Sequence, residues 1–277
     1  MRRLLLLVAG LSMLGVVIVV LAVLEARSMP VVRRATVELR DWPEEAPPIT
    51  VALISDLHVG NVSTDEDRLA RVVSMLNALR PDLVLIAGDF IAGHEPTAAA
   101  QRAPALAALK RLRARLGTVA VPGNHDHWTG LGIVRRELAR AGVTVLTNDA
   151  VRRGPVVILG VDDTYTHHDD LAKTLGATAK LTGPRLLLSH SPDVMPRVPR
   201  EVPLVLAGHT HCGQIVLPLI GAPSIPSEYG KRYACGIVRE SGHSLIVTGG
   251  IGTSVLPIRW NAPPDAWLLT LRAPPAR

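Results

Sequence analysis

The pattern of hydrophobic and polar positions divides the chain into one long apolar block near its start and a series of short apolar runs after it. Residues 4–24 carry no charge, and Ser12 is the one polar side chain among them. As a helix rising about 1.5 Å per residue, this block spans about 30 Å, the thickness of a bilayer core. The sequence therefore predicts a single-pass transmembrane anchor within residues 1–26 and a location at the cell membrane.

A cleaved signal peptide is the competing interpretation of the apolar block. The apolar region of a signal peptide is about 7–15 residues long and precedes a small-x-small cleavage site. The block here is longer, and residues 24–26, Leu-Glu-Ala, make a poor cleavage site. These features favour an uncleaved anchor.

Charges on either side of the block bear on its orientation. Arg2 and Arg3 precede it, whereas Glu25 and Arg27 nearly cancel after it. The positive-inside bias then leaves the N-terminus in the cytoplasm and predicts that the rest of the chain is extracytoplasmic. An arginine pair at 33–34 weakens this bias.

Beyond the block, short β-branched runs alternate with amphipathic segments. Residues 27–48 are predicted to be a linker with an edge strand at 31–39, and residues 49–277 to form one domain. The other predicted strands are 49–55, 83–87, 118–121, 143–146, 156–161, 186–189, 204–207, 244–248 and 266–271. Helices are predicted at 65–80 with Thr64 as N-cap, at 98–116 and at 131–141. This alternation indicates an α/β fold with a largely parallel sheet, and the strand-rich later half indicates a second sheet with antiparallel members.

Composition narrows the classes of partner. Aromatic residues make up 3% of the 277 residues, so base stacking is an unexpected mode of binding and no nucleic-acid partner is predicted. The net charge of +6 fits an anionic substrate or a lipid surface, and solvated surface arginines explain it equally well. The two cysteines show no metal-binding spacing and no disulfide framework. A single disulfide would fit a domain outside the cytoplasm.

Aspartate, asparagine and histidine residues follow five of the predicted strands. The segments are Asp56-Leu57-His58, Gly88-Asp89, Gly123-Asn124-His125-Asp126, His190 and Gly208-His209-Thr210-His211. Active groups of such folds collect beyond the carboxyl ends of strands, so we expect these side chains to converge. Strand alternation would let Asp56 with His58, and His209 with His211, each face one cavity. Without a cation, this cluster of polar groups would be costly to bury.

The types of these side chains indicate which ion they would bind. Aspartate, asparagine and histidine without cysteine suit divalent manganese, iron or zinc. Seven ligands exceed the three or four that a tetrahedral zinc takes. They fit two divalent ions that share a carboxylate and clamp the attacking and leaving oxygens of a phosphoryl transfer. The predicted ligands are Asp56, His58, Asp89, Asn124, His190, His209 and His211.

In order and spacing, these motifs resemble the calcineurin-like metallophosphoesterase superfamily. The resemblance implies a four-layer α/β/β/α sandwich with a dinuclear centre, and a phosphoester as substrate. It assigns Asp56, His58, Asp89 and His211 to one ion, and Asp89, Asn124, His190 and His209 to the other, with Asp89 bridging. It also implies that His125 lies beside the substrate and that Asp126 orients His125.

Finer features resemble membrane-associated phosphodiesterases of the bacterial YkuE/YaeI type, some of which hydrolyse UDP-2,3-diacylglucosamine. They lie in residues 190–193, 208–218, 229–233 and 252–259, and they imply a lipid-linked phosphodiester as a candidate substrate. Two departures stand out: Cys212 replaces a usual glycine, and Thr248-Gly249-Gly250 replaces a common Ser-Arg-Gly. Loss of that arginine removes a phosphate contact, for which the candidate replacements are Arg259, Lys231 and Arg232. Cys212 itself is expected to be buried and inert.

Two other classes compete with a phosphoesterase. A dinuclear metal amidohydrolase has an early His-x-His and a carboxylated lysine, whereas here His-x-His is late and no lysine flanks a strand end. A non-catalytic, membrane-tethered metal-binding module would be expected to lack at least one ligand, and all seven are present. Of the histidines outside the motifs, His94 and His127 are close enough in sequence to line the pocket, and the remaining ones at 167, 168 and 243 carry no assigned role.

Overall fold

The computed structural model describes residues 1–275 and contains two six-stranded sheets. In spatial order, the first sheet consists of β1 (Val31–Glu38), β12 (Asp265–Arg272), β2 (Ile49–Ile54), β3 (Leu83–Ala87), β4 (Thr118–Val121) and β5 (Val143–Val145). The second consists of β10 (Gly236–Glu240), β11 (His243–Val247), β9 (Leu204–Ala207), β8 (Arg185–Leu188), β7 (Val156–Gly160) and β6 (Asp149–Arg153). Strands β2 to β5 run parallel, as do β7, β8, β9 and β11, while β12 is antiparallel to β2 and β6 to β7.

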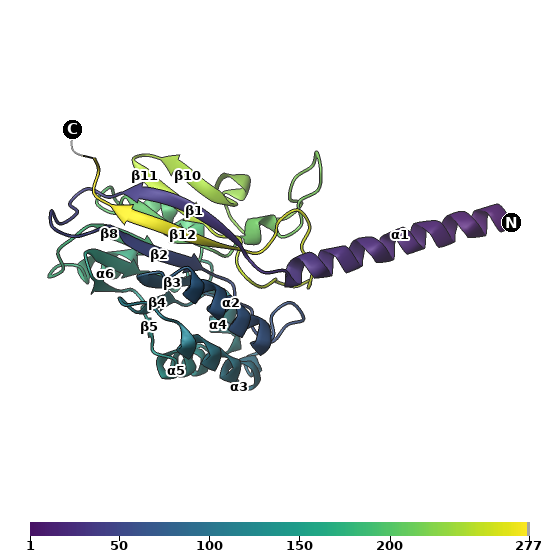
Figure 1. The fold of residues 1–277 in the computed structure, drawn as a ribbon, viewed down its shortest axis with the longest axis horizontal. Helices are drawn as coiled ribbons and strands as arrows, with labels where there is room; N and C mark the ends of the chain where they lie inside the picture. The colour runs from purple at the N-terminus through teal and green to yellow at the C-terminus, as the bar shows by residue number, and fades with distance from the viewer. Residues whose placement is uncertain (276–277) are drawn as a thin grey trace.

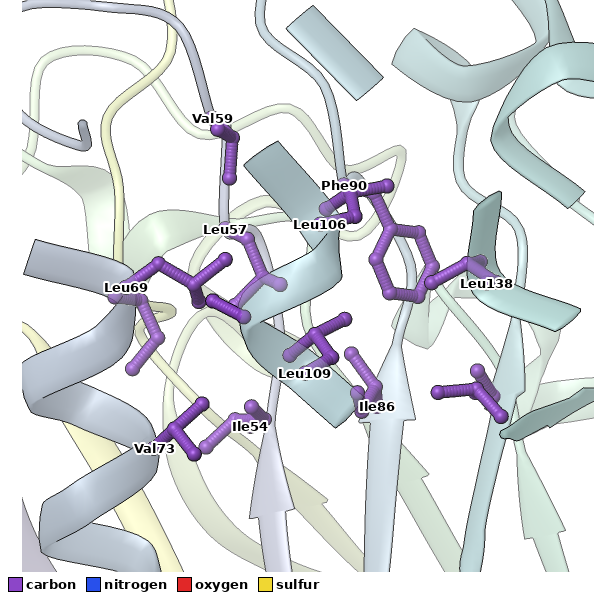
Figure 2. Close-up of a cluster of buried hydrophobic side chains, with 14 of the residues drawn as sticks. Ile54, Leu57, Val59, Leu69, Val73, Ile86, Phe90, Leu106, Leu109 and Leu138 are labelled. Carbon is purple, nitrogen blue, oxygen red and sulfur yellow. The ribbon is translucent and has the colours of Figure 1, made fainter. Parts of the chain in front are cut away.

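Three apolar layers hold the sheets and helices together. In the first, Phe90 and Leu106 pack with residues of the first sheet and of helices α2 (Glu66–Ala78) and α5 (Leu131–Arg140) (Figure 2). The second lies between the sheets and includes Leu85 and Leu206, and the third joins the second sheet to Val194 of the 3-10 helix η2 (Pro192–Arg197). The order is therefore helices, sheet, sheet, helices, as expected for the four-layer sandwich.

Apart from the long N-terminal helix, the remaining helices are short. They are α3 (Ala98–Arg102), η1 (Ala103–Arg111), α4 (Asn124–Thr129), α6 (Leu171–Gly176), η3 (His211–Gly213) and η4 (Gly230–Tyr233). Helix α1 (Arg2–Arg27) projects away from the two sheets (Figure 1). Among the described residues, α1 is the one helix long and apolar enough to cross a membrane.

Two helical predictions were inaccurate for local reasons. The segment 98–116 is not one α-helix, because α3 ends at Arg102 and continues as a 3-10 helix with Pro104 in its first turn. Proline lacks the N–H that an α-helical hydrogen bond needs. The N-cap of α2 is Asp65 rather than Thr64, since the Asp65 carboxylate accepts a hydrogen bond from the Arg68 N–H at 2.7 Å.

At the edges of the two sheets, one strand was predicted and two were missed. The edge strand expected near 31–39 is present as β1, which pairs in parallel with β12. Strands β6 and β10, which are the edges of the second sheet, were missed. Both carry charged side chains, including Arg153 and Glu240, and charge is a common protection of edge strands that hides the apolar alternation of a strand.

Candidate metal centre

The side chains predicted as metal ligands follow the carboxyl ends of strands from both sheets. Strands β2, β3 and β4 lie in parallel in the first sheet, and β8 and β9 in the second. Their carboxyl ends meet at one end of the sandwich, where the seven side chains converge and are buried. In chain order they are Asp56, His58, Asp89, Asn124, His190, His209 and His211.

Left-handed backbone, not strand alternation, directs most of these side chains. The φ angles of Asp56, His58, Asp89, His209 and His211 lie between 44° and 69°. Each residue therefore belongs to a tight turn after its strand, so the expected alternation of strand residues does not apply. Aspartate and histidine enter this region more readily than most residues, and such conformations gather at functional sites.

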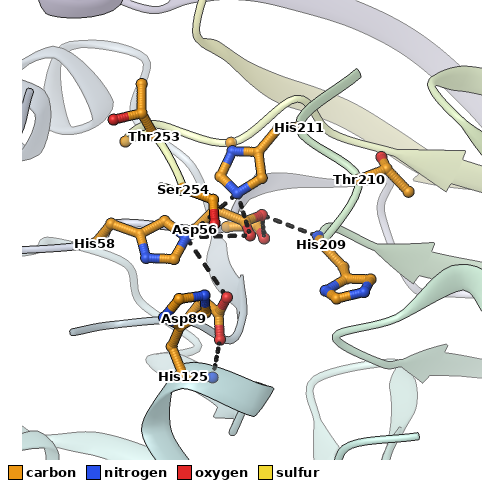
Figure 3. A network of polar contacts seen from close by, with 12 residues as sticks. Asp56, His58, Asp89, His125, His209, Thr210, His211, Thr253 and Ser254 are labelled. Carbon is orange, nitrogen blue, oxygen red and sulfur yellow. Dashed lines mark hydrogen bonds and ion pairs between the residues drawn. The ribbon is translucent and has the colours of Figure 1, made fainter. Parts of the chain in front are cut away.

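Four side chains form a first cluster: Asp56, His58, Asp89 and His211 (Figure 3). The Nε2 atoms of His58 and His211 lie 3.2 Å apart. The Asp56 Oδ1 atom is 3.4 Å from His211 Nε2 and 3.8 Å from His58 Nε2. The Asp89 Oδ2 atom lies 3.5 Å from His58 Nε2.

A second cluster shares Asp89 and adds Asn124, His190 and His209. The His190 Nε2 atom lies 3.0 Å from Asn124 Oδ1 and 3.1 Å from His209 Nδ1. It also lies 3.3 Å from Asp89 Oδ2. Asp89 Oδ2 therefore stands between the imidazole nitrogens of both clusters.

The donor atoms fit divalent cations. Ligands bound at about 2.0–2.2 Å from one ion are about 3.0–3.5 Å from each other, and most of the distances above fall in this range. Asp56 Oδ1 is buried and makes no hydrogen bond within the described chain, although an oxygen of a buried carboxylate needs a partner. A cation between Asp56, His58 and His211 would provide it.

Electrostatics keep two of the histidines, His58 and His209, neutral for this role. Burial lowers the pKa of His58 and of His209 to about 3, so both rings are neutral at pH 7 and can donate a lone pair to a metal. Burial raises the pKa of Asp56 to about 6. Burial also opposes charge on Asp89 and His190, but their attraction to each other and to the other charged groups around them together outweighs it, lowering the pKa of Asp89 and raising that of His190. The buried carboxylates thus stabilise a positive charge that lies between them.

His125 and Asp126 do not interact as expected. His125 Nδ1 lies 2.8 Å from the carbonyl oxygen of Gly93, and because a carbonyl only accepts, this nitrogen carries the proton. The Asp126 carboxylate instead accepts the backbone N–H groups of Asp89 and Gly123 at 3.0 and 2.9 Å. The prediction that Asp126 orients His125 is therefore wrong: Gly93 holds the ring, and Asp126 fixes the ligand-bearing turns.

The two departures from the family pattern are in contact with each other. Cys212 forms a disulfide with Cys235 at a Cα–Cα distance of 4.7 Å. Cys212 is therefore half-buried rather than buried as expected, and its sulfur is bonded in the single disulfide that the sequence had left open. A Cβ atom at Gly249 would lie 3.1 Å from Cys212 Sγ. A larger side chain at this position would have to displace the sulfur, so the cysteine and the glycine fit together as a pair.

None of the suggested replacements for the missing arginine lines a cavity beside the centre, although Arg259 lies 3.3 Å from the ring Nδ1 atom of His211. Arg259 is fully buried, and its guanidinium donates to the carbonyls of Gly249 and Gly252 at 2.6 Å each. Its role is to hold the surrounding loops together. Lys231 is exposed and reaches the carbonyl of Ile220, and Arg232 pairs with a carboxylate of β10.

Two cavities flank the clusters. The first, of about 320 Å³, is lined by His58 and His125 together with His94 and Arg102. His94 thus lines the pocket as predicted, whereas His127 bonds to Asp162 at 2.8 Å. Arg102 was missed because it lies at the end of a short helix with no motif around it.

The second cavity, of about 680 Å³, lies on the side of the second cluster. Its lining includes Tyr165, Ser191 and Tyr229. The ring of Tyr165 lies 4.8 Å from that of His209. Tyr165 was also missed, because only the fold brings its loop beside His209.

Known proteins are similar to this chain along most of its length. Residues 49–213 match the profile of the family described as calcineurin-like phosphoesterase. The chain is 31% identical over 230 residues to the uncharacterized metallophosphoesterase YkuE of Bacillus subtilis, covering 80% of this chain and 79% of YkuE. It is 30% identical over 242 residues to phosphodiesterase YaeI of Escherichia coli, covering 83% and 84%.

One vertebrate relative is named a transmembrane protein. The chain is 30% identical over 263 residues to a transmembrane protein with metallophosphoesterase domain from Danio rerio, covering 88% of this chain and 57% of the fish protein. The family profile covers more than half of the chain, and the two bacterial relatives are matched along most of their own length. The chain therefore belongs to the calcineurin-like phosphoesterase family and is a metal-dependent phosphoester hydrolase.

Proposed function

We propose that the chain is a membrane-anchored phosphodiesterase that holds two divalent ions in the two clusters. The position of Asp89 carries this proposal, because its Oδ2 atom lies 3.5 Å from His58 Nε2 and 3.3 Å from His190 Nε2. A carboxylate between two sets of imidazoles can serve one cation on each side. The donor set suits manganese, iron or zinc.

Each chemical role then falls to a defined group. Bound divalent ions would stabilise the charge on the phosphoryl oxygens and lower the pKa of the attacking water. His125 lines the first cavity with its ring 4.6 Å from that of His58. Since its Nδ1 proton is held by Gly93, His125 Nε2 is the ring atom that would take a proton from solvent and donate it to the leaving oxygen as the P–O bond breaks, while the attacking water loses its proton to solvent. Asp126 acts indirectly, by binding the backbone of the turns that carry Asp89 and His125.

Two cavities favour a phosphodiester over a phosphomonoester. A diester carries two substituents on phosphorus, and the cavities near His125 and near Tyr165 can take one each. The relative YaeI is named a phosphodiesterase, which supports the same substrate class. The first cavity is partly lined by Val62, Val255 and Pro257, so its substituent is proposed to be apolar. A lipid-linked diester such as UDP-2,3-diacylglucosamine is a substrate of this kind.

We further propose that the domain is extracytoplasmic, with residues 1–26 as the anchor, residues 27–48 as the linker that includes β1, and residues 49–277 as the catalytic domain. Arg2 and Arg3 precede the apolar span and favour a cytoplasmic N-terminus. The disulfide between Cys212 and Cys235 fits an oxidising compartment.

Replacing Asp89 tests the dinuclear assignment. In the full-length chain, Asp89→Asn should lower hydrolysis of bis-p-nitrophenyl phosphate with added manganese by at least about 100-fold, because a shared ligand is lost. Elemental analysis should find two ions per wild-type chain and fewer in the variant. Asp149→Asn, which changes an exposed aspartate of β6, is the matched control.

Several outcomes would contradict the proposal. If the Asp89→Asn variant hydrolysed the substrate at the wild-type rate, Asp89 would not be a ligand of the metal centre. Two bound ions without turnover of any phosphoester would favour the non-catalytic module, and faster hydrolysis of amides than of diesters would favour an amidohydrolase. A comparison of phosphodiesters, nucleotide-linked lipids and phosphomonoesters with manganese, iron and zinc would define substrate and metal.

A further inference from the structure

Apolar side chains remain exposed on loops beside the end of α1. Leu219 is 109% exposed and Ile220 is 65% exposed, relative to a free residue. On a second loop, Val255 is 87% exposed and Leu256 is 51% exposed. With their neighbours they form a group that we call the apolar rim, made up of Val62, Leu217, Leu219, Ile220, Val255 and Leu256.

Hydrogen bonds join the loop of Leu217, Leu219 and Ile220 to the loop of Val255 and Leu256. The backbone groups of Leu217 and Gly221 bond to each other at 3.0 and 2.8 Å, which closes a tight turn around Leu219. The side chain of Gln214 accepts the N–H of Ser254 at 2.9 Å and donates to the carbonyl of Leu256 at 3.0 Å. The rim is therefore held in place although its side chains are exposed.

The joined loops are attached to the apolar span of α1. The Arg259 N–H donates to the carbonyl of Ala22 at 2.9 Å, and the Ala262 N–H donates to Glu25 Oε1 at 3.1 Å. Ala22 lies within the apolar span, two residues or about 3 Å along the helix from its end at Leu24. The second loop therefore lies level with the last turn of the span, at the end of the domain from which α1 leaves (Figure 1).

Side chains suited to a membrane interface border the rim. Trp260 lies half-buried between the two residues that bond to α1, and tryptophan is enriched at the level of the lipid headgroups. The exposed Lys231 reaches the carbonyl of Ile220 at 3.4 Å, where its charge can meet anionic headgroups.

We propose that the apolar rim inserts into the bilayer that α1 spans, so that the domain rests on the membrane through a second contact. The rim continues the apolar surface of α1, whose Leu21 and Leu24 are also exposed. Val62 and Val255 belong both to the rim and to the lining of the first cavity. That cavity then opens at the level of the headgroups. The proposal concerns the surface and does not depend on which phosphoester is hydrolysed.

Depth-dependent quenching in vesicles tests this contact. The full-length chain, reconstituted in phosphatidylcholine and phosphatidylglycerol vesicles, would carry Leu219→Cys or Val255→Cys labelled with the fluorophore NBD. Both labels should lose most of their emission when the lipid acyl chains carry nitroxides, and little to iodide in the water. Ile237→Cys, on an exposed position of β10, is the matched control and should behave in the opposite way. The wild-type chain, labelled identically, measures any reaction of the native cysteines.

Two results would overturn the proposal. Labels at 219 and 255 that respond to iodide and not to lipid nitroxides, as at 237, would place the rim in water. Labels shielded from both quenchers, but self-quenched as the labelled chain is concentrated in the vesicles, would assign the rim to a second copy of the chain.

Discussion

Two neighbouring segments, 209–214 and 217–221, follow the same strand but are built in opposite ways. In the first, His211 is polar and only 4% exposed, and its ring lies against Asp56 and His58. In the second, Leu219 is apolar and fully exposed. Burying polar groups is costly unless they find partners, and exposing a large apolar group is unusual unless it meets another surface. The buried polar segment therefore fits the proposed binding of a cation. The exposed apolar segment fits the proposed contact with a membrane.

The largest expected effect is a difference in catalytic turnover between variants of the two segments. His211→Ala removes a proposed ligand and should lower turnover of bis-p-nitrophenyl phosphate by at least about 100-fold. Leu219→Ala should leave turnover of this water-soluble substrate unchanged, because its side chain is exposed and makes no contact with the clusters. Steady-state kinetics, with circular dichroism to confirm folding, measure both. A similar loss in the two variants would break the comparison.

An intermediate effect concerns the disulfide that fixes the ligand segment. Cys212 follows His211 directly and is bonded to Cys235 across a separation of 23 residues. Reduction should lower the free energy of unfolding by about 3 kcal/mol, because the unfolded chain regains the freedom of that loop. Urea unfolding with and without dithiothreitol measures the change. The Cys212→Ser/Cys235→Ser variant should not respond to dithiothreitol, and equal stability of the wild-type chain under both conditions would refute the prediction.

The smallest effect is the pH dependence of metal binding. Burial raises the pKa of Asp56 to about 6, whereas His58 and His209, at about 3, stay neutral throughout. As the pH falls below about 6, a cation must displace the proton on Asp56, so manganese affinity should fall by up to about tenfold per pH unit. Above that pH a dependence should persist, because the raised pKa of His190 leaves a second proton for the cation to displace. Manganese titration followed by electron paramagnetic resonance measures it, and a constant affinity between about pH 5 and pH 7 would count against Asp56.

Much of the fold was predictable because it depends on local patterns. The runs at 83–87 and 204–207 are continuously apolar, and 49–55 is apolar except at Thr50 and Ser55; all three are central strands buried almost entirely on both faces. The failures also have local causes: Pro104 turns one helix into a 3-10 segment, and charged edge strands such as β6 lack apolar alternation. Residue types that follow strand ends also predicted which side chains gather at one end of the sandwich.

Hydrogen-bond partners were not predictable in the same way. Asp126 is adjacent to His125 in sequence, yet its carboxylate binds the N–H of Asp89, 37 residues away. Arg259 has the charge of a phosphate ligand, but it is surrounded by backbone carbonyls, including that of Gly252. A side chain bonds to whatever the fold brings within about 3 Å, and sequence distance does not report this.

The sequence by itself determined the chemistry of the chain: an uncharged span long enough to cross a bilayer, and aspartate, asparagine and histidine at strand ends. These features follow from composition and periodicity, which act over a few residues. Only the tertiary structure decided that Asp89 stands between two clusters, that Cys212 fills the space beside Gly249, and that the Arg259 N–H bonds to Ala22 of α1. Each of these depends on contacts between segments far apart in the chain, and such contacts exist only once the sheets and loops have packed.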